Sequence, residues 1–309
     1  MRKPRALRPG DKIAVIAPAS SFARDEFDAG VAELRRLGYE PVYDETVFAR
    51  DAYVAGEPSL RAAAFRRAWA DEEVAALIAV RGGYGSVHIL PLLDAAEVRR
   101  APKPFIGYSD NTSILSWLTT RCGVVSFHGP MLEGRLAHGE SAYDRDTFTR
   151  VLSIDEPAGE ITHPELEALM PGEASGTLVG GTLTQLLASF RTPFEFDPPG
   201  GHVLFIDEVA ERPYRLDRML TQLRLSGWLA KASALVFGEL PRCDEPTESG
   251  VTARAVVTRV LAGFPGPVLF GLPSGHTTAP CLTLPFGVRA RVVAGARPAV
   301  IIEEAAVTA

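Results

Sequence analysis

Cysteine is scarce in this chain: only Cys122, Cys243 and Cys281 occur among its 309 residues. The three lie far apart and show no CxxC spacing, so the sequence predicts neither a disulfide framework nor a zinc site. We expect them to be small buried side chains. No HExxH motif and no paired-histidine spacing is present, which argues against a catalytic metal.

Basic charge is also in short supply, with 32 Lys and Arg against 38 Asp and Glu and a formal net charge of −6. This balance argues against a general nucleic-acid surface, which needs a basic face. No apolar run approaches the roughly 18 residues of a membrane span. The apolar stretch behind the basic start, MRKPR, is too short for a signal peptide. We therefore expect a cytoplasmic protein without nucleic-acid or membrane partners.

A dinucleotide fingerprint is missing as well. The segment RGGYGS, residues 81–86, does not fit GxGxxG, and it follows a later strand-like run rather than the first one. The sequence thus predicts no nicotinamide or flavin cofactor. Gly82 and Gly83 have two other uses: bare backbone N–H groups for an oxyanion hole, or a tight loop that needs positive φ.

The first half of the chain alternates short apolar runs with helical segments. The strand-like runs are KIAVIAPAS, VAALIAVRGG, PFIGYS and VVSFHGP. Residues 25–40 and 59–73 have helical spacing, and the first of these segments places Phe27, Val31, Leu34 and Leu37 on one face. Such alternation predicts a parallel sheet covered by helices on both faces. We expect a flavodoxin-like or Rossmann-like domain over residues 1–135.

The rest of the chain is predicted to form two further units. Residues 136–175 are more polar, with one helical segment and several turn residues, which is typical of a connector. Apolar runs resume over 176–309 and predict a mixed α/β domain. The final run, residues 288–304, is broken by AGARP and reads as a β-hairpin with alternating faces.

Several reactive side chains follow these strand-like runs, where ligands of open parallel sheets bind. Ser109 follows one run, Asp207 and Glu208 follow another, and His276 stands in a Pro-Ser-Gly-His turn after a third. GYSDN around Ser109 lacks the second glycine of GxSxG, so the hydroxyl is either a nucleophile or a helix N-cap. A nucleophilic serine needs a base and an orienting carboxylate, and the chain offers them in the order Ser, acid, His.

The motifs that carry these residues also define a resemblance. Seven motifs follow one another along nearly the whole chain: RPGDKIAVIAPAS, VRGGYGS, PFIGYSDNT, FHGP, VGGTLTQL, LFIDEVAERPYRLDRML and GLPSGH. Together they resemble the LD-carboxypeptidase family of serine peptidases, which includes the microcin C self-immunity proteins. The resemblance implies an N-terminal flavodoxin-like domain with the nucleophile and a C-terminal domain with the acid and the histidine. It also suggests a homodimer.

Matched motif by motif, the resemblance implies a role for each candidate. Ser109 corresponds to the nucleophile and His276 to the general base. The backbone N–H of Asp110, with one from the Gly82–Gly83 loop, corresponds to the oxyanion hole.

The acidic residue that would partner His276 cannot be matched as directly. Family members usually read LFLED or LFIED where this chain has LFIDE, so that the aligned position holds an aspartate. Alternation along a strand points neighbours to opposite faces and favours Asp207, with Glu208 as the alternative.

The resemblance implies a murein tetrapeptide as substrate, cleaved between the L-centre of a diamino acid and the terminal D-alanine during cell-wall recycling. Arg81 and Arg215 are candidates to pair with the substrate carboxylate, because guanidinium binds carboxylates bidentately. Tyr84 of the RGGYGS loop is a further candidate for substrate contact.

Three other functions compete with this prediction. Within the family, the rival is hydrolysis of a peptidyl- or aminoacyl-adenylate analogue, but the E-x-P-Y-R segment at 211–215 resembles the carboxypeptidase branch, and residues 131–175 contain no tryptophan to clamp an adenine. A small-ligand binding protein would need no nucleophile, and Ser109 would then only cap a helix. An ordinary α/β-hydrolase esterase would need an HGGG-type loop and a true GxSxG, and both are missing.

Overall fold

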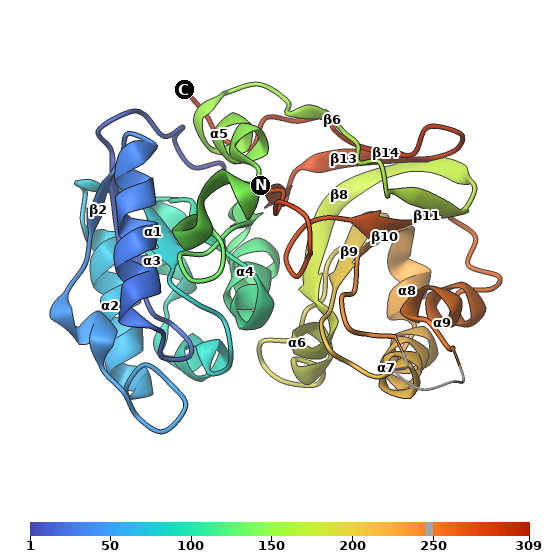
Figure 1. Cartoon of the computed structure of the whole chain (residues 1–309), viewed down its shortest axis with the longest axis horizontal. Coiled ribbons are helices and arrows are strands. Elements are labelled where there is room, and N and C mark those ends of the chain that lie inside the picture. The colour runs from blue at the N-terminus through green and yellow to red at the C-terminus, as the bar shows by residue number, and fades with distance from the viewer. Residues whose placement is uncertain (245–249) are drawn as a thin grey trace.

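The computed structural model describes residues 1–244 and 250–309. Within them the chain forms two mixed sheets, one in each of two lobes that stand side by side in Figure 1. The first lobe is blue to green, and the second is yellow to red. Helix α4 of the first lobe faces α6 of the second at the junction.

The sheet of the first lobe has the order β12-β5-β4-β3-β1-β2. Its strands are β1 (Lys12–Ile16), β2 (Glu40–Val42), β3 (Val74–Ala79), β4 (Phe105–Gly107), β5 (Ser126–His128) and β12 (Leu284–Phe286). The strands β1 to β5 run parallel in the order 2-1-3-4-5, which is the flavodoxin-like arrangement and confirms the predicted fold class. Strand β12 pairs antiparallel with β5 although it comes from the far end of the chain.

Helices cover this sheet where the sequence predicts them. They are α1 (Arg24–Arg36), α2 (Pro58–Ala70), α3 (Ala95–Arg100) and α4 (Thr112–Ser116), which continues as a π-helix over Trp117–Cys122; short 3₁₀ turns span Glu45–Phe48, Ser86–Leu92, Ser109–Asn111 and Leu136–Ser141. Helix α1 buries Phe27, Val31 and Leu34, the face expected from their spacing, and ends just before Leu37. Helix α2 begins at Pro58, whose missing N–H costs nothing at a first helical position.

The second sheet has the order β6-β14-β13-β8-β9-β10-β11-β7. Its strands are β6 (Gly159–Ile161), β7 (Glu167–Met170), β8 (Gly172–Thr182), β9 (His202–Asp207), β10 (Ala232–Gly238), β11 (Val268–Leu272), β13 (Arg289–Ala294) and β14 (Ala299–Ile302). The middle strands β8 to β11 are parallel, and antiparallel strands flank them. Strands β13 and β14 form the predicted hairpin.

The remaining helices are α5 (Arg145–Ser153), α6 (Leu183–Ala188), α7 (Pro213–Leu225), α8 (Trp228–Lys231) and α9 (Ala253–Val260). Helix α5 is the helical segment expected between residues 136 and 175. Strands β6 and β7 of that range join the second sheet at its two ends. The connector residues are thus part of the second lobe's sheet as well as a link.

A hydrophobic core runs through the first lobe and across the junction, and it includes Phe127 of the first lobe and Phe205 of the second. All three cysteines belong to the described residues; each is buried and outside any disulfide, as predicted. Among the described residues, no helix has both the length and the apolar character of a membrane span.

The two lobes meet closely because strand β8 carries glycine at its end. A Cβ on Gly181 would lie 2.5 Å from the side chain of Thr112, the first residue of α4. With glycine there, the N–H of Thr182 donates to Thr112 Oγ1 at 3.0 Å, and Gln185 of α6 donates to Asp110 Oδ1 at 3.1 Å. The VGGTLTQL motif therefore fixes the turn around Ser109 against the second lobe.

Candidate active site

The turn from β4 into the following helix places Ser109 in a strained conformation. Its φ is +62°, a left-handed value that residues other than glycine seldom adopt and that tends to mark functional turns. The hydroxyl has no hydrogen-bond partner among the described residues, and the serine does not cap the helix that follows. The alternative in which Ser109 serves only as an N-cap is therefore not supported. A sharp strand-to-helix turn that exposes its hydroxyl is typical of a nucleophile.

The RGGYGS loop lies directly against this turn at Gly82. A Cβ on Gly82 would stand 2.7 Å from Ser109 Cβ, 2.9 Å from Ser109 Oγ and 3.4 Å from the Asp110 nitrogen. The next residue, Gly83, has φ +90° and packs on Ser20. The N–H groups of Gly83 and Asp110 donate to no acceptor among the described residues. The Asp110 N–H thus borders the space beside Ser109 Oγ, and the Gly83 N–H, also without an acceptor among the described residues, lies on the adjoining loop.

A Gly82→Ala variant tests this arrangement. The added methyl group would stand 2.7 Å from Ser109 Cβ and displace the serine turn, and we expect kcat/KM to fall by about 10²-fold or more because the reacting groups are misplaced. The circular dichroism spectrum should stay close to that of the wild type, because Gly82 does not have positive φ and its backbone conformation is open to alanine. Near-normal activity in the Gly82→Ala enzyme would show that the loop does not approach the reacting atoms.

The Asp110 side chain forms a hydrogen bond with the same loop at Ser86. Its carboxylate is buried and accepts from Ser86 N at 2.7 Å, and the Ser86 hydroxyl donates back to the Asp110 carbonyl at 2.6 Å. Burial raises the pKa of this carboxyl. Arg61, also buried, donates to the carbonyls of Pro18 and Gly85. Several hydrogen bonds therefore hold the loop of Gly82 in place, although it contains three glycines.

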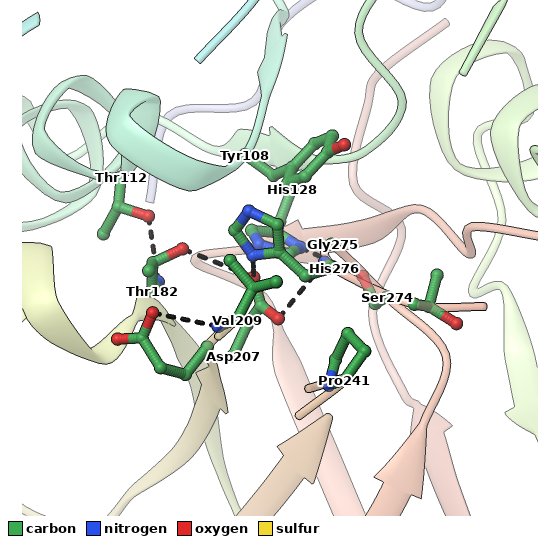
Figure 2. A network of polar contacts seen from close by, with 12 residues as sticks. Tyr108, Thr112, His128, Thr182, Asp207, Val209, Pro241, Ser274, Gly275 and His276 are labelled. Carbon is green, nitrogen blue, oxygen red and sulfur yellow. Dashed lines mark hydrogen bonds and ion pairs between the residues drawn. The ribbon is translucent and has the colours of Figure 1, made fainter. Parts of the chain in front are cut away.

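A carboxylate and an imidazole meet at the ends of the second lobe's strands. His276 Nδ1 lies 2.7 Å from Asp207 Oδ2, and the His276 backbone N–H donates to Asp207 Oδ1 at 3.2 Å (dashed lines in Figure 2). Asp207 is fully buried at the end of β9 and also accepts from Thr182 Oγ1 at 3.3 Å. The two contacts with Asp207 hold the His276 side chain in place. Because a carboxylate oxygen accepts, Nδ1 must carry the hydrogen, and Nε2 is left as the basic nitrogen.

The pKa of His276 is raised above its ordinary value. Burial acts to lower it, but the charge of Asp207 and its hydrogen bond to the ring outweigh that effect. The imidazolium that forms when His276 accepts a proton is thereby stabilised. This is the electrostatic behaviour expected of a general base beside a carboxylate.

The raised pKa gives a prediction for the pH dependence. A base must be neutral to accept a proton, so activity is lost below its pKa and gained above it. We expect kcat/KM to rise with pH through an apparent pKa above the value of about 6.5 that is usual for histidine. An Asp207→Asn enzyme should show the midpoint at lower pH in whatever activity remains. A wild-type midpoint well below 6.5 would contradict the pairing.

Glu208 points to the other side of the strand end. Its carboxylate accepts from the Thr184 N–H at 2.9 Å, the Thr184 hydroxyl at 2.7 Å and the Val209 N–H at 3.0 Å. Burial raises the pKa of this group. Neighbouring side chains thus point to opposite sides at the end of β9, as the strand period predicts. Asp207 contacts His276, and Glu208 contacts the first turn of α6.

The histidine turn is brought to the serine turn by Tyr108. The Tyr108 ring meets His276 edge-on at 5.2 Å between centroids, and Tyr108 immediately precedes Ser109. Figure 2 shows Tyr108 of the first lobe close to His276 of the second. The structure therefore gathers the Ser109 turn, Asp207 and His276 at the junction of the lobes.

Two residues that the sequence did not single out hold the histidine turn. Arg135 donates to the carbonyls of Gly275 and Thr277 at 3.0 and 2.9 Å, and its Nε lies 3.4 Å from the Tyr108 hydroxyl. Glu239, just after β10, accepts from the hydroxyl of Thr277 and from the N–H of Thr278. No local pattern marks them, because each acts on residues far away in the sequence.

His128 lies against this turn through its contact with Ser274. It is fully buried, with Nδ1 3.0 Å from Ser274 Oγ, Nε2 without a partner, and Phe286 stacked on the ring at 5.3 Å. Burial lowers its pKa to about 4, so the ring is neutral. Across residues 1–244 and 250–309, no group of three or more side chains is placed to bind a metal ion.

The candidates for substrate binding are spread more widely. Arg81 is half-exposed and pairs with Glu133 at 2.9 Å, and Arg215 lies on the first turn of α7, 3.6 Å from Glu211. Neither has a hydrogen bond or ion pair with Ser109 or His276 in the described part of the chain. Tyr84 is exposed on the loop that carries Gly82. Arg81 and Tyr84 both belong to the loop that carries Gly82, and Asn111 of the Ser109 turn donates through Nδ2 to the Arg81 carbonyl at 3.1 Å.

Two family models match this chain, one in each half. The family model described as the LD-carboxypeptidase N-terminal domain matches residues 13–129, and the one described as the LD-carboxypeptidase C-terminal domain matches residues 175–292. The first therefore covers the Ser109 turn, and the second covers Asp207 and His276.

Individual relatives match nearly the whole chain. A probable murein peptide carboxypeptidase of Bacillus subtilis is 32% identical over 301 residues, which cover 97% of this chain and 94% of that protein. The crystal structure of muramoyltetrapeptide carboxypeptidase from Oxalobacter formigenes superposes with a TM-score of 0.83 at 31% identity, covering 95% of this chain and 99% of its own.

A second group of relatives carries a different name. Microcin C7 self-immunity protein MccF in complex with aspartyl sulfamoyl adenosine has a TM-score of 0.92 at 25% identity, with full coverage of both chains. The protein of that name from Escherichia coli is 28% identical over 304 residues, 88% of this chain and 87% of its own.

Proposed function

The chain belongs to the LD-carboxypeptidase family and is a serine-type peptidase, and from this premise we propose that it hydrolyses murein tetrapeptide. The bond cleaved is the amide between the L-centre of a diamino acid and the terminal D-alanine. The observation that carries the proposal is the buried Asp207–His276 pair set against the strained Ser109 turn. Relatives named for murein peptides at 31 and 32% identity support the substrate class.

The proposed mechanism follows from the positions of the groups. Ser109 Oγ attacks the amide carbonyl while His276 Nε2 takes its proton, and Asp207 holds the imidazolium in place. The N–H groups of Asp110 and of the Gly82–Gly83 loop hold the oxygen of the tetrahedral intermediate. His276 gives the proton to the leaving amine of D-alanine, and water then releases the acyl group by the same route. The nucleophile comes from the unit 1–135, and the acid and base come from 176–309.

A peptidyl- or aminoacyl-adenylate analogue is the second candidate substrate. The superposition on MccF with its bound aspartyl sulfamoyl adenosine favours it. The same Ser109 chemistry would serve, because both substrates present a carbonyl with a leaving group. We favour the murein peptide because E-x-P-Y-R at 211–215 follows the acid as in the carboxypeptidase branch.

The test is release of D-alanine. The purified protein is incubated with murein tetrapeptide, with a tetrapeptide ending in L-alanine, and with an acyl-sulfamoyl adenosine, and products are followed by mass spectrometry. The proposal expects D-alanine from the first substrate and much less turnover of the other two. No release of D-alanine from folded protein would overturn it, and turnover of the adenosine compound alone would assign the second function.

We also propose that this activity belongs to cell-wall recycling in the cytoplasm and that the working form is a homodimer. Both expectations come from the family resemblance. Sedimentation of the purified chain measures the oligomeric state directly.

A further inference from the structure

Two exposed tyrosines stand together at the edge of the loop that carries Gly82. Tyr53 is 64% exposed and Tyr84 is 44% exposed, and their rings lie 5.8 Å apart between centroids at an angle of 53°. Large aromatic side chains gain by burial, so an adjacent exposed pair beside an active-site loop indicates a surface that binds something.

The pair is held in place by the backbone around it. The N–H of Tyr84 donates to Ser20 Oγ at 3.0 Å, and the Tyr84 ring meets His88 edge-on at 5.1 Å. Tyr53 stands in a tight turn in which Asp51 and Val54 exchange backbone hydrogen bonds of 3.0 and 2.9 Å. A pre-ordered aromatic surface loses little conformational entropy when a ligand settles on it.

The pair also lies at a usable distance from Ser109. Gly82 touches the Ser109 turn, and Tyr84 is two residues further along, at most about 7 Å by backbone length. Tyr84 in addition lines a cavity together with Thr112 and Gln185 at the junction of the lobes. Three extended peptide residues span about 10 Å. The part of a substrate that lies three residues before the scissile bond can therefore reach the two tyrosines.

From these positions we infer that Tyr53 and Tyr84 form a subsite for a sugar ring, the muramoyl end of a muramoyl-peptide. This inference rests on the proposed function, in which the peptide before the scissile bond leads back to that sugar. The C–H groups on one face of a pyranose pack on the negative face of an aromatic ring. The exposed phenol hydroxyls add donors and acceptors for sugar hydroxyls and the N-acetyl group. Rings at 53° make a corner that fits a puckered sugar, whereas a flat nucleobase is best held by parallel rings.

The experiment compares two substrates in wild-type, Tyr53→Ala and Tyr53→Phe enzymes: free murein tetrapeptide and N-acetylmuramoyl-tetrapeptide. The wild type is expected to favour the muramoyl substrate in kcat/KM by about tenfold, the size of one good aromatic contact. Tyr53→Ala should bring this ratio close to one, and Tyr53→Phe, which keeps the ring, should preserve most of it.

Each other outcome counts against the subsite. An unchanged ratio in Tyr53→Ala, or a wild-type ratio near one, would overturn the inference while D-alanine release still upheld the proposed function. If the wild type cleaved neither peptide, the proposed function itself would fail. If Tyr53→Ala selectively lost turnover of an acyl-sulfamoyl adenosine, the pair would be a nucleobase site instead.

Discussion

A Ser109→Ala variant is expected to release D-alanine about 10⁴-fold more slowly than the wild-type enzyme, because no other group can form the acyl intermediate. The rate that remains would come from binding and from the open N–H groups beside the turn. The measurement is single-turnover D-alanine release by mass spectrometry, with KM or peptide binding measured in parallel to show that the site still forms.

The strain at this turn supplies a matched control. Left-handed φ at a residue other than glycine costs about 1–3 kcal/mol. A Ser109→Gly variant should therefore be as inactive as Ser109→Ala but more stable than it, by about 1 kcal/mol. Equal melting temperatures would show that the left-handed turn carries no strain. Activity above a few per cent in both variants would mean that the nucleophile lies elsewhere.

The second large effect concerns the neighbouring acids of β9. We expect Asp207→Ala to lower kcat by about 10³–10⁴-fold, because His276 loses the group that fixes its tautomer and stabilises its charge. Glu208→Ala should keep most of the activity, since its carboxylate contacts Thr184 and Val209 and not the histidine. The second variant should instead be less stable, because the Thr184 N–H, the Thr184 hydroxyl and the Val209 N–H lose their acceptor.

Glu208→Gln is the control for that loss of stability, because it keeps an oxygen that can accept from Thr184. The kinetic constants and melting temperatures of all three variants decide the assignment. The reverse pattern, an inactive Glu208→Ala enzyme beside an active Asp207→Ala enzyme, would reassign the acid.

Much of this geometry could be predicted from the sequence because it is local. The alternation of apolar runs and helical segments predicts β1 to β5 with their helices, and the strand period predicts that Asp207 and Glu208 point to opposite sides. The exposed hydroxyl of Ser109 follows from a strand that turns at once into a helix. In each case the pattern and its cause lie close together along the chain.

What could not be predicted depends on partners that are distant in the sequence. Strand β12 adds to β5 across half of the chain, and nothing in its three apolar residues indicates which edge they join. Arg135 lies in a polar stretch, and its role appears only when Gly275 and Thr277 come next to it. A hydrogen bond from an arginine side chain to a backbone carbonyl has no sequence motif, because every residue has such a carbonyl.

The contribution of β12 to the first lobe has a consequence for synthesis on the ribosome. The unit that carries Ser109 emerges first, yet the outer edge of β5 stays unpaired until residue 286 has left the ribosome. His276 emerges only shortly before. The nascent chain therefore carries a serine without its base and a sheet with an open edge, which is the state most exposed to mispairing with other chains. Catalytic competence and closure of that edge therefore arrive together, because His276 and β12 are close neighbours along the chain.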